Sequence, residues 1–254
     1  MPKIRQHVNP LKSDLLTIAE VPRVCPPRDG FLEVELGSAE SGILIERARV
    51  TDGGLLVGVE IRREMVARAD RMCAEAGVDP ARGGAGFEAA FQGLLGGVSG
   101  ADGLSPAPLD RGGFVGAPQR PFLGSPVRNV FANIAVDLPR LFAPGSVRRF
   151  HINFPDPWFK SRQHKRRVVS PALVEDLARA LEAGGEVSLM TDIFDIALEA
   201  MALLESDQSG GRRFVNAGGP WSFWQRNPWG ARSRRERQCE LEGQKIWRLY
   251  YRVA

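Results

Sequence analysis

The sequence predicts an α/β protein with a doubly wound, mostly parallel sheet and an antiparallel strand at the carboxyl end. Short apolar runs typical of buried strands alternate with segments of helical periodicity, and this alternation favours βαβ units. The last apolar segment alternates with polar residues, as an antiparallel strand does. With 254 residues and 43% hydrophobic residues, the chain can bury one sizeable core, so we expect a single domain over residues 1–254.

The first third of the chain shows a strand, helix, strand, helix pattern. The run FLEVEL at 31–36 predicts a buried strand that ends at Gly37, and a helix is expected over 41–50. GLLVGVEI at 54–61 predicts a second strand, and apolar residues at helical spacing predict a helix over 63–77. These four elements form a βαβ unit with its following helix.

Glycine and proline recur across residues 79–126, in GGAG, GGVSG, SPAP, RGG and GSP. A segment of this composition lacks the periodic apolar residues that a packed element needs, so we expect a flexible surface insertion. Its one helix-like piece is 87–95. We assign no chemistry to the insertion.

The second half of the chain resumes the alternation. A helix is expected after Ser170, a good N-cap with proline at the next position, and its apolar stripe runs to Leu181 before Gly184 ends it. The remaining elements are predicted as strands at 127–134, 148–154 and 186–192, helices at 138–142 and 196–204, and a final antiparallel strand at 245–253.

Positive charge is concentrated in two segments. The formal net charge is +4, and five of the eight residues in 160–167 are Lys or Arg. The segment 226–252 adds eight Lys or Arg against three Glu. This segregation predicts a surface for a polyanion, nucleic acid first, although a solvated Arg-rich face has the same composition.

Other functional classes are not indicated. Cys25, Cys73 and Cys239 are far apart and lack the spacing of zinc ligands or of a disulfide framework, so we expect buried thiols and no metal site. No apolar run has the length of a membrane span, and the amino terminus lacks the apolar core of a signal peptide. These features predict a cytoplasmic protein without a membrane partner.

Ligands of a doubly wound sheet gather at the carboxyl ends of its strands. Glu60 ends the second strand, where a carboxylate can accept both hydroxyls of a ribose. Each acid alone is also compatible with a helix N-cap or a first-turn charge. The chain lacks the G-x-G-x-x-G spacing and the phosphate cradle of nucleotide-binding loops, so a nucleoside without phosphates is favoured, S-adenosylmethionine first. The polar residues at the predicted strand ends are Glu35, Glu60, Asn133, Asp156 and Asp192.

The stretch INFPDPWFKSRQHKRR, which spans 152–167, closely resembles the signature of bacterial tRNA (guanine-N7)-methyltransferases. The segments RQHVNPL, VELG, GVE and MTD follow the family's order. The resemblance implies a Rossmann-like methyltransferase fold, S-adenosylmethionine as cofactor and tRNA as partner. The methylated guanine is expected in the tRNA variable loop, at position 46.

The resemblance also implies roles for individual residues. Asp156 matches the family's catalytic acid. The residues that match cofactor contacts are Glu35, Gly37, Glu60, Asn133 and Asp156. The residues that match tRNA contacts are Lys160, Arg162, Gln163, His164, Lys165, Arg166, Arg167, Asp192, Ser233 and Glu236. Monomer and homodimer are both compatible with the sequence.

General chemistry supports an acid at position 156. Guanine N7 carries a lone pair and no proton, so methylation there needs positioning more than a general base. A carboxylate can hold the guanine N–H groups and offset the charge that the purine gains. Pro155 and Pro157 fix φ on both sides of Asp156. Trp158 is expected either to pack beneath this loop or to stack on a base.

Two positions depart from the family's E-[IL]-G-x-G-x-G pattern, because Ala39 and Ser41 stand where it has glycine. A side chain there disfavours a positive φ and crowds the cofactor. The altered glycine loop favours an alternative hypothesis, an RNA-binding protein of the same fold that has lost catalysis. Arg235 stands where an aromatic residue is common, a change that bears on RNA docking. A methyltransferase for proteins or small molecules leaves the basic segment 160–167 unexplained.

Overall fold

The structure is a computed structural model and describes residues 8–78, 125–206 and 214–254. The predicted helix-like piece 87–95 and residues 79–124 of the predicted insertion lie outside the described residues. At the end of that segment, Ser125 is fully buried and its hydroxyl donates to the carbonyl of Thr51. Ser125, within the expected insertion 79–126, is therefore part of the folded core.

A sheet of seven strands organises the described chain, in the order β3-β2-β1-β4-β5-β7-β6. β7 pairs antiparallel with both β5 and β6, and the other neighbouring pairs are parallel. The predicted doubly wound, mostly parallel sheet with an antiparallel carboxyl-terminal strand is thus confirmed. The strands are β1 (Phe31–Leu36), β2 (Gly54–Glu60), β3 (Val127–Phe131), β4 (Val147–Asn153), β5 (Leu181–Thr191), β6 (Phe214–Asn216) and β7 (Trp247–Val253).

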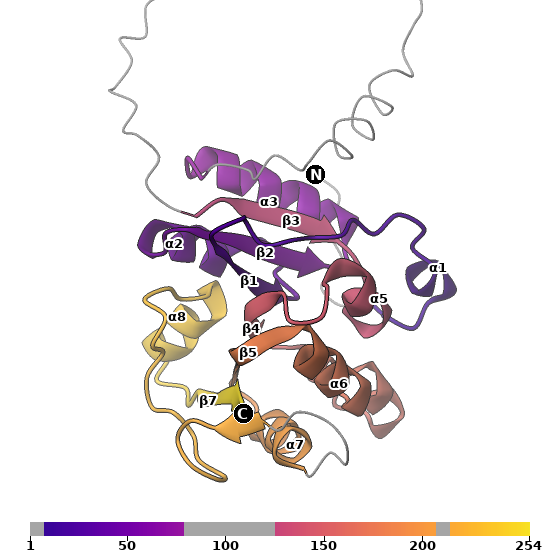
Figure 1. Ribbon diagram of the computed structural model, residues 1–254. Helices are drawn as coiled ribbons and strands as arrows, with labels where there is room; N and C mark the ends of the chain where they lie inside the picture. Colours follow the sequence, from indigo (N-terminus) through magenta and orange to yellow (C-terminus); the bar gives the residue numbers. More distant parts are fainter. Residues whose placement is uncertain (1–7, 79–124, 207–213) are drawn as a thin grey trace, which may run out of the picture.

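Helices cover both faces of the sheet (Figure 1). Side chains of α5, α6 and α7 share one apolar cluster with the sheet, and side chains of α2, α3 and α8 share the other. The helices are α1 (Ser13–Leu16), α2 (Gly42–Val50), α3 (Arg63–Glu75), α5 (Ile134–Leu141), α6 (Pro171–Ala180), α7 (Phe194–Glu205) and α8 (Arg234–Leu241), with a 3₁₀ helix at Ser161–Arg166. No described helix is long and apolar enough to cross a membrane.

Three expectations from the sequence were wrong in detail. The predicted strand at 127–134 ends as β3 at Phe131, and α5 begins at Ile134 rather than at residue 138. Helix α6 ends at Ala180, so Leu181 is the first residue of β5 and Gly184 lies inside that strand. The buried stripe does include Leu181, but its backbone is extended and it pairs with Val147, where the register of β4 shifts. Cys25 is exposed, whereas Cys73 and Cys239 are buried as expected.

The strand FLEVEL is buried on both faces, although its alternate residues are acidic. Leu32, Val34 and Leu36 enter the larger apolar cluster, so Glu33 and Glu35 point to the opposite face. Glu33 is 1% exposed and accepts hydrogen bonds from Arg47 Nε at 2.9 Å and from Arg149 Nη1 at 2.6 Å. This ion-pair cluster joins β1, α2 and β4 beneath the site.

The pKa of Glu33 reflects these partners. Burial alone would raise it, but the hydrogen bonds from His151 and Arg47 hold the pKa of Glu33 well below its usual range. Burial also lowers the pKa of His151, whose Nε2 lies 3.4 Å from Glu33 Oε2. The imidazole is therefore a neutral structural group with Nε2–H donating to Glu33.

We predict that Glu33→Gln lowers the free energy of unfolding by about 3 kcal/mol at pH 7, because it leaves the largely buried guanidinium of Arg47 without its charge partner and Arg149 with Glu186 alone. Urea denaturation of the variant and of wild type measures this change in the free energy of unfolding. Glu182→Gln is the control, since Glu182 pairs with Arg148 at the surface and should cost under about 1 kcal/mol. The stabilisation by Glu33 should begin to decline as the pH falls below the ordinary pKa of 4.5 and should be lost only at the much lower folded pKa. Equal costs for the two variants would contradict the structural role of Glu33.

Candidate active site

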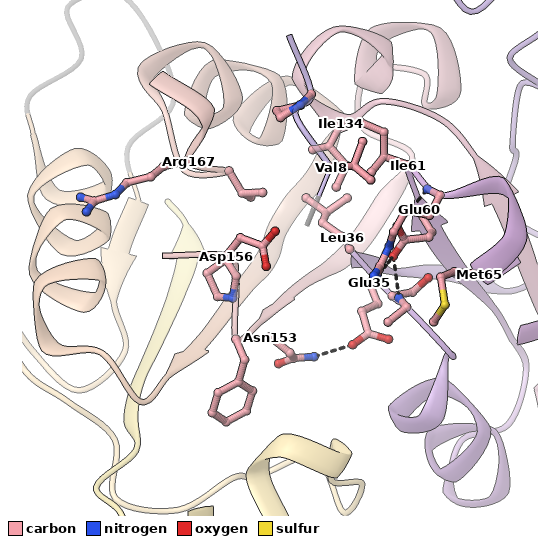
Figure 2. A pocket seen from close by; sticks show the side chains of 18 of the residues that line it. Val8, Glu35, Leu36, Glu60, Ile61, Met65, Ile134, Asn153, Asp156 and Arg167 are labelled. Carbon is pink, nitrogen blue, oxygen red and sulfur yellow. Dashed lines mark hydrogen bonds and ion pairs between the residues drawn. The ribbon is translucent and has the colours of Figure 1, made fainter. Parts of the chain in front are cut away.

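A cavity of about 650 Å³ opens at the carboxyl edge of the sheet, where β1 and β4 lie side by side and their following loops diverge. The sheet order reverses at this point, which is where ligands bind in doubly wound folds. The lining comes from the ends of β1, β2 and β4, from the start of α5 and from the start of α8. Figure 2 shows Glu35, Glu60 and Asp156 around this cavity.

Glu35 lies at the floor of the cavity and is 4% exposed. Asn153 Nδ2 donates to its Oε1 at 2.9 Å, as the dashed line in Figure 2 marks. Its Oε2 is buried and has no hydrogen-bond partner among the described residues. Burial, and to a lesser degree repulsion from Glu60, raises the pKa of Glu35 to about 8, although the bond from Asn153 acts against this. The group is therefore protonated at pH 7 and ready to ionise beside a cation.

The loop after β1 adopts left-handed conformations at three positions. Gly37 has φ of +79°, Ala39 +46° and Ser41 +55°. The loop thus takes positive φ values even where side chains replace glycine, at a cost of about 1–2 kcal/mol for each such residue. A Cβ on Gly37 would meet nothing within 4 Å, so its conformation, not crowding, favours glycine there. This backbone forms one wall of the cavity.

Glu60 is the last residue of β2, as predicted, and it is buried. Its Oε2 accepts from Ala39 N at 2.9 Å, which ties the loop after β1 to the end of β2. The guanidinium of Arg62 also pairs with Glu60, with Nε 2.8 Å from Oε1. Arg62 was not among the site residues predicted from the sequence, although it stands only two residues beyond the acid.

Asn133 lines the cavity, but its side-chain amide mainly holds the chain together. Its Nδ2 donates to the carbonyls of Pro10 and Leu15 at 2.8 and 3.0 Å, and its Oδ1 caps α5 by accepting from Ala135 N. Both donors are used, so only the second lone pair of Oδ1 remains for a ligand. The residue fastens the segment around α1 to the rim of the site.

Asp156 extends into the cavity from the loop after β4 (Figure 2). Phe154 and Trp158, two residues to either side, both have left-handed φ, +48° and +43°. Phe154 N also donates to Met190 O at 2.7 Å, which anchors the loop to the end of β5. With a proline on each side of Asp156, the loop has little freedom and fixes the direction of the carboxylate.

Trp158 lines the cavity and contacts the basic segment. The guanidinium of Arg166 lies 5.1 Å from the centre of its ring, a cation–π contact. Trp158 is only partly buried. It therefore joins the rigid Asp156 loop to the cations that follow, and both of its expected roles are compatible with this position.

The basic segment divides into exposed and anchored cations. Arg167 belongs to the anchored group, because its Nε donates to Pro157 O at 2.9 Å and its guanidinium pairs with Glu199 of α7. Figure 2 shows Arg167 pointing away from the cavity. The segment therefore presents five exposed polar side chains outward: Lys160, Ser161, Arg162, His164 and Lys165.

The expected carboxyl-terminal site residues separate as well. Ser233 lines the cavity and caps α8, its Oγ accepting from Glu236 N at 3.0 Å. Glu236 is fully buried away from the cavity lining and accepts from Arg248 Nη2 at 2.9 Å, so it holds the fold. Asp192, directly after β5, is paired with Arg235 of α8, which lines the cavity. The spacing Ser-x-x-Glu is also a helix-capping pattern, a signal that favours α8.

The topology, with antiparallel β7 between β5 and β6, is that of a Rossmann-like methyltransferase fold. Residues 125–249 match a family model described as a putative methyltransferase. The tRNA (guanine-N(7)-)-methyltransferase of Synechococcus sp. (strain JA-3-3Ab) is 31% identical over 98% of this chain and 84% of its own. That of Synechococcus sp. (strain JA-2-3B'a(2-13)) is 32% identical over 98% and 83%. The chain belongs to the tRNA (guanine-N7)-methyltransferase family.

We predict that Glu35→Gln makes the ligand-free protein more stable than wild type at pH 9 and nearly equal to it at pH 5. Gln resembles the protonated acid. The folded pKa of about 8 lies above the ordinary 4.5, so the folded state binds more protons and wild-type stability falls as pH rises between these values. Urea midpoints at the two pH values measure the difference. If the stability difference between Glu35→Gln and wild type is the same at pH 5 and pH 9, Glu35 does not titrate in this way.

Proposed function

We infer that this protein transfers a methyl group from S-adenosylmethionine to N7 of a guanine in tRNA, and we propose the variable loop, position 46, as the target. The observation that carries the inference is the cavity in which Asp156 faces Glu35 and Glu60, next to the basic segment 160–167. Identity above 30% with tRNA (guanine-N(7)-)-methyltransferases over nearly the whole chain supports it. A tRNA substrate in turn favours the cytoplasm as the site of action.

The cavity residues fit the proposed cofactor. The buried Oε2 of Glu35 can accept from an ammonium group, and a cation there favours the ionised form of this acid. Gly37 lets a ligand approach the backbone, and Glu60 stands at the ribose position of the fold. A volume of about 650 Å³ suits a ligand of this size. When bound, S-adenosylmethionine supplies the electrophilic methyl group.

Asp156 is the residue that we assign to the guanine. Its carboxylate can accept hydrogen bonds from the base N–H groups, which fixes the direction of the N7 lone pair. The same negative charge offsets the positive charge that the purine gains on methylation. No proton has to be removed from N7, so rigid placement by the loop from Phe154 to Trp158 accounts for the role of this acid.

The exposed cations of the basic segment are proposed to bind tRNA phosphates. Lys160, Arg162 and Lys165 are exposed, Lys165 also lines the cavity, and Gln163 and His164 add polar contacts. Phosphate contacts position the RNA without reading its sequence. Arg167 differs, because its pair with Glu199 commits it to holding the segment on α7.

The alternative, an RNA-binding protein without catalysis, rested on Ala39 and Ser41. The loop nonetheless has the left-handed conformations that glycines would adopt, and the cavity beside it is open. We therefore favour the enzyme.

The direct test is methylation of an unmodified tRNA transcript by the purified protein. Nucleoside mass spectrometry should detect 7-methylguanosine, and a transcript with adenine in place of guanine 46 should remain unmodified. Methylation of both transcripts would refute the proposed position while keeping the reaction. The absence of 7-methylguanosine with every tRNA tried would refute the reaction.

We predict that Asp156→Asn lowers the single-turnover rate of methyl transfer by about 100-fold, because Asn keeps the shape but lacks the charge that stabilises the methylated purine. Affinity for tRNA should change less than about threefold. Filter binding measures the affinity and quench-flow the rate. A variant that retains the full rate would remove Asp156 from the chemistry.

We predict that replacing Lys160, Arg162 and Lys165 by Ala makes the negative slope of log affinity for tRNA against log salt shallower by about 2. Each phosphate that is no longer neutralised should reduce the magnitude of the slope by about 0.7–0.9. Arg167→Ala is the matched control: it should leave the slope unchanged and lower the melting temperature, because Arg167 pairs with Glu199. If the triple variant keeps its slope, tRNA docks on another surface.

A further inference from the structure

The hydrogen bonds around Glu60 leave no room for another donor. Its Oε1 accepts from Arg62 N at 3.0 Å and Arg62 Nε at 2.8 Å. Its Oε2 accepts from Arg62 Nη2 at 3.0 Å and from Ala39 N at 2.9 Å. An ionised carboxylate offers about four lone-pair sites. All of them are used in this structure.

This saturation conflicts with the ribose role proposed for Glu60. Two ribose hydroxyls need two acceptor positions on the carboxylate. The amides of Ala39 and Arg62 are backbone groups and cannot leave without moving the loop after β1 or the start of α3. The guanidinium of Arg62, by contrast, can leave by rotation of its side chain. It occupies the two positions that the hydroxyls need.

The ion pair between Glu60 and Arg62 is strong enough to affect ligand binding. Glu60 is 3% exposed and Arg62 is 17% exposed, whereas the surface pair of Glu40 and Arg68 is 24% and 49% exposed. Ion pairs that are withdrawn from water are screened far less than surface pairs. Asp156 and Glu40 also contribute to the negative field at Arg62. A displaced guanidinium therefore stays among acids, inside the site.

We propose that Arg62 sets the affinity of the cofactor site by competing with the ribose hydroxyls for Glu60. The inference rests on the proposed function, because it takes a ribonucleoside as the ligand. A competitor of this kind lowers affinity for both the cofactor and its demethylated product. It thereby favours product release, a step that often limits turnover.

The test is the affinity of wild type and Arg62→Ala for S-adenosylhomocysteine, measured by isothermal titration calorimetry. Removal of the competitor should tighten binding by about tenfold, in line with the net value of hydrogen bonds to a charged group. Arg63→Ala is the matched control. It removes the same charge one residue away, from a guanidinium stacked 4.1 Å from the centre of the Phe131 ring, and should not alter affinity. Arg62→Gln keeps most of the side chain's length and should give an intermediate increase if the Ala variant folds poorly.

A pair of ligands isolates the hydroxyl contribution. Adenosine should gain affinity in Arg62→Ala, whereas 2′,3′-dideoxyadenosine, which cannot donate to Glu60, should not. If wild type binds S-adenosylhomocysteine and the Arg62 variants bind it equally or more weakly, the competition is refuted and the proposed function stands. If wild type does not bind S-adenosylhomocysteine at all, the proposed function fails, and this inference fails with it.

Discussion

The site depends on a difference between two glutamates of the same strand face. Glu33 and Glu35 are two residues apart on β1, both are buried, and both point toward α2 and α8. Glu33 is surrounded by Arg47, Arg149 and His151, so it stays ionised and holds β1 to its neighbours. Glu35 accepts a hydrogen bond from the neutral amide of Asn153, and burial keeps it protonated. The first makes the sheet edge rigid, and the second places a protonated acid at the cavity floor.

Most of the other carboxylates near the site form ion pairs with arginines. Three acids that resemblance assigned to ligands are paired within the chain, namely Glu60 with Arg62, Asp192 with Arg235 and Glu236 with Arg248. Such pairing limits mutual repulsion among acids that share one edge of the sheet. At Glu60 a ligand must therefore exchange bonds with the protein, whereas at Glu35 it meets a buried Oε2 that has no hydrogen-bond partner among the described residues. Replacement of the Arg62 guanidinium at Glu60 makes affinity adjustable by a single arginine.

The sequence predicted the architecture well, because its signals are local. The apolar runs of β1 and β2 and the cap at Ser170 depend on neighbouring residues, and the structure confirms them. The end of α6 was misplaced because Leu181 suits either a helix stripe or a buried strand, and only pairing with Val147 decides. The partners of Glu236, Arg167 and Asn133 were not predictable, since they lie on elements distant in sequence. Hydrogen bonds across such distances leave no pattern in the chain.

We propose that Glu35 is a buried, protonated acceptor for the cofactor's cation. Calorimetric titration with S-adenosylmethionine at pH 7, in two buffers of different ionisation enthalpy, tests it most directly. Since the pKa of Glu35 is about 8 in the free protein and should fall below 7 beside a cation, the account predicts release of roughly one proton on binding. Binding with no proton release would contradict that role for Glu35, and no detectable binding would contradict the cofactor site itself.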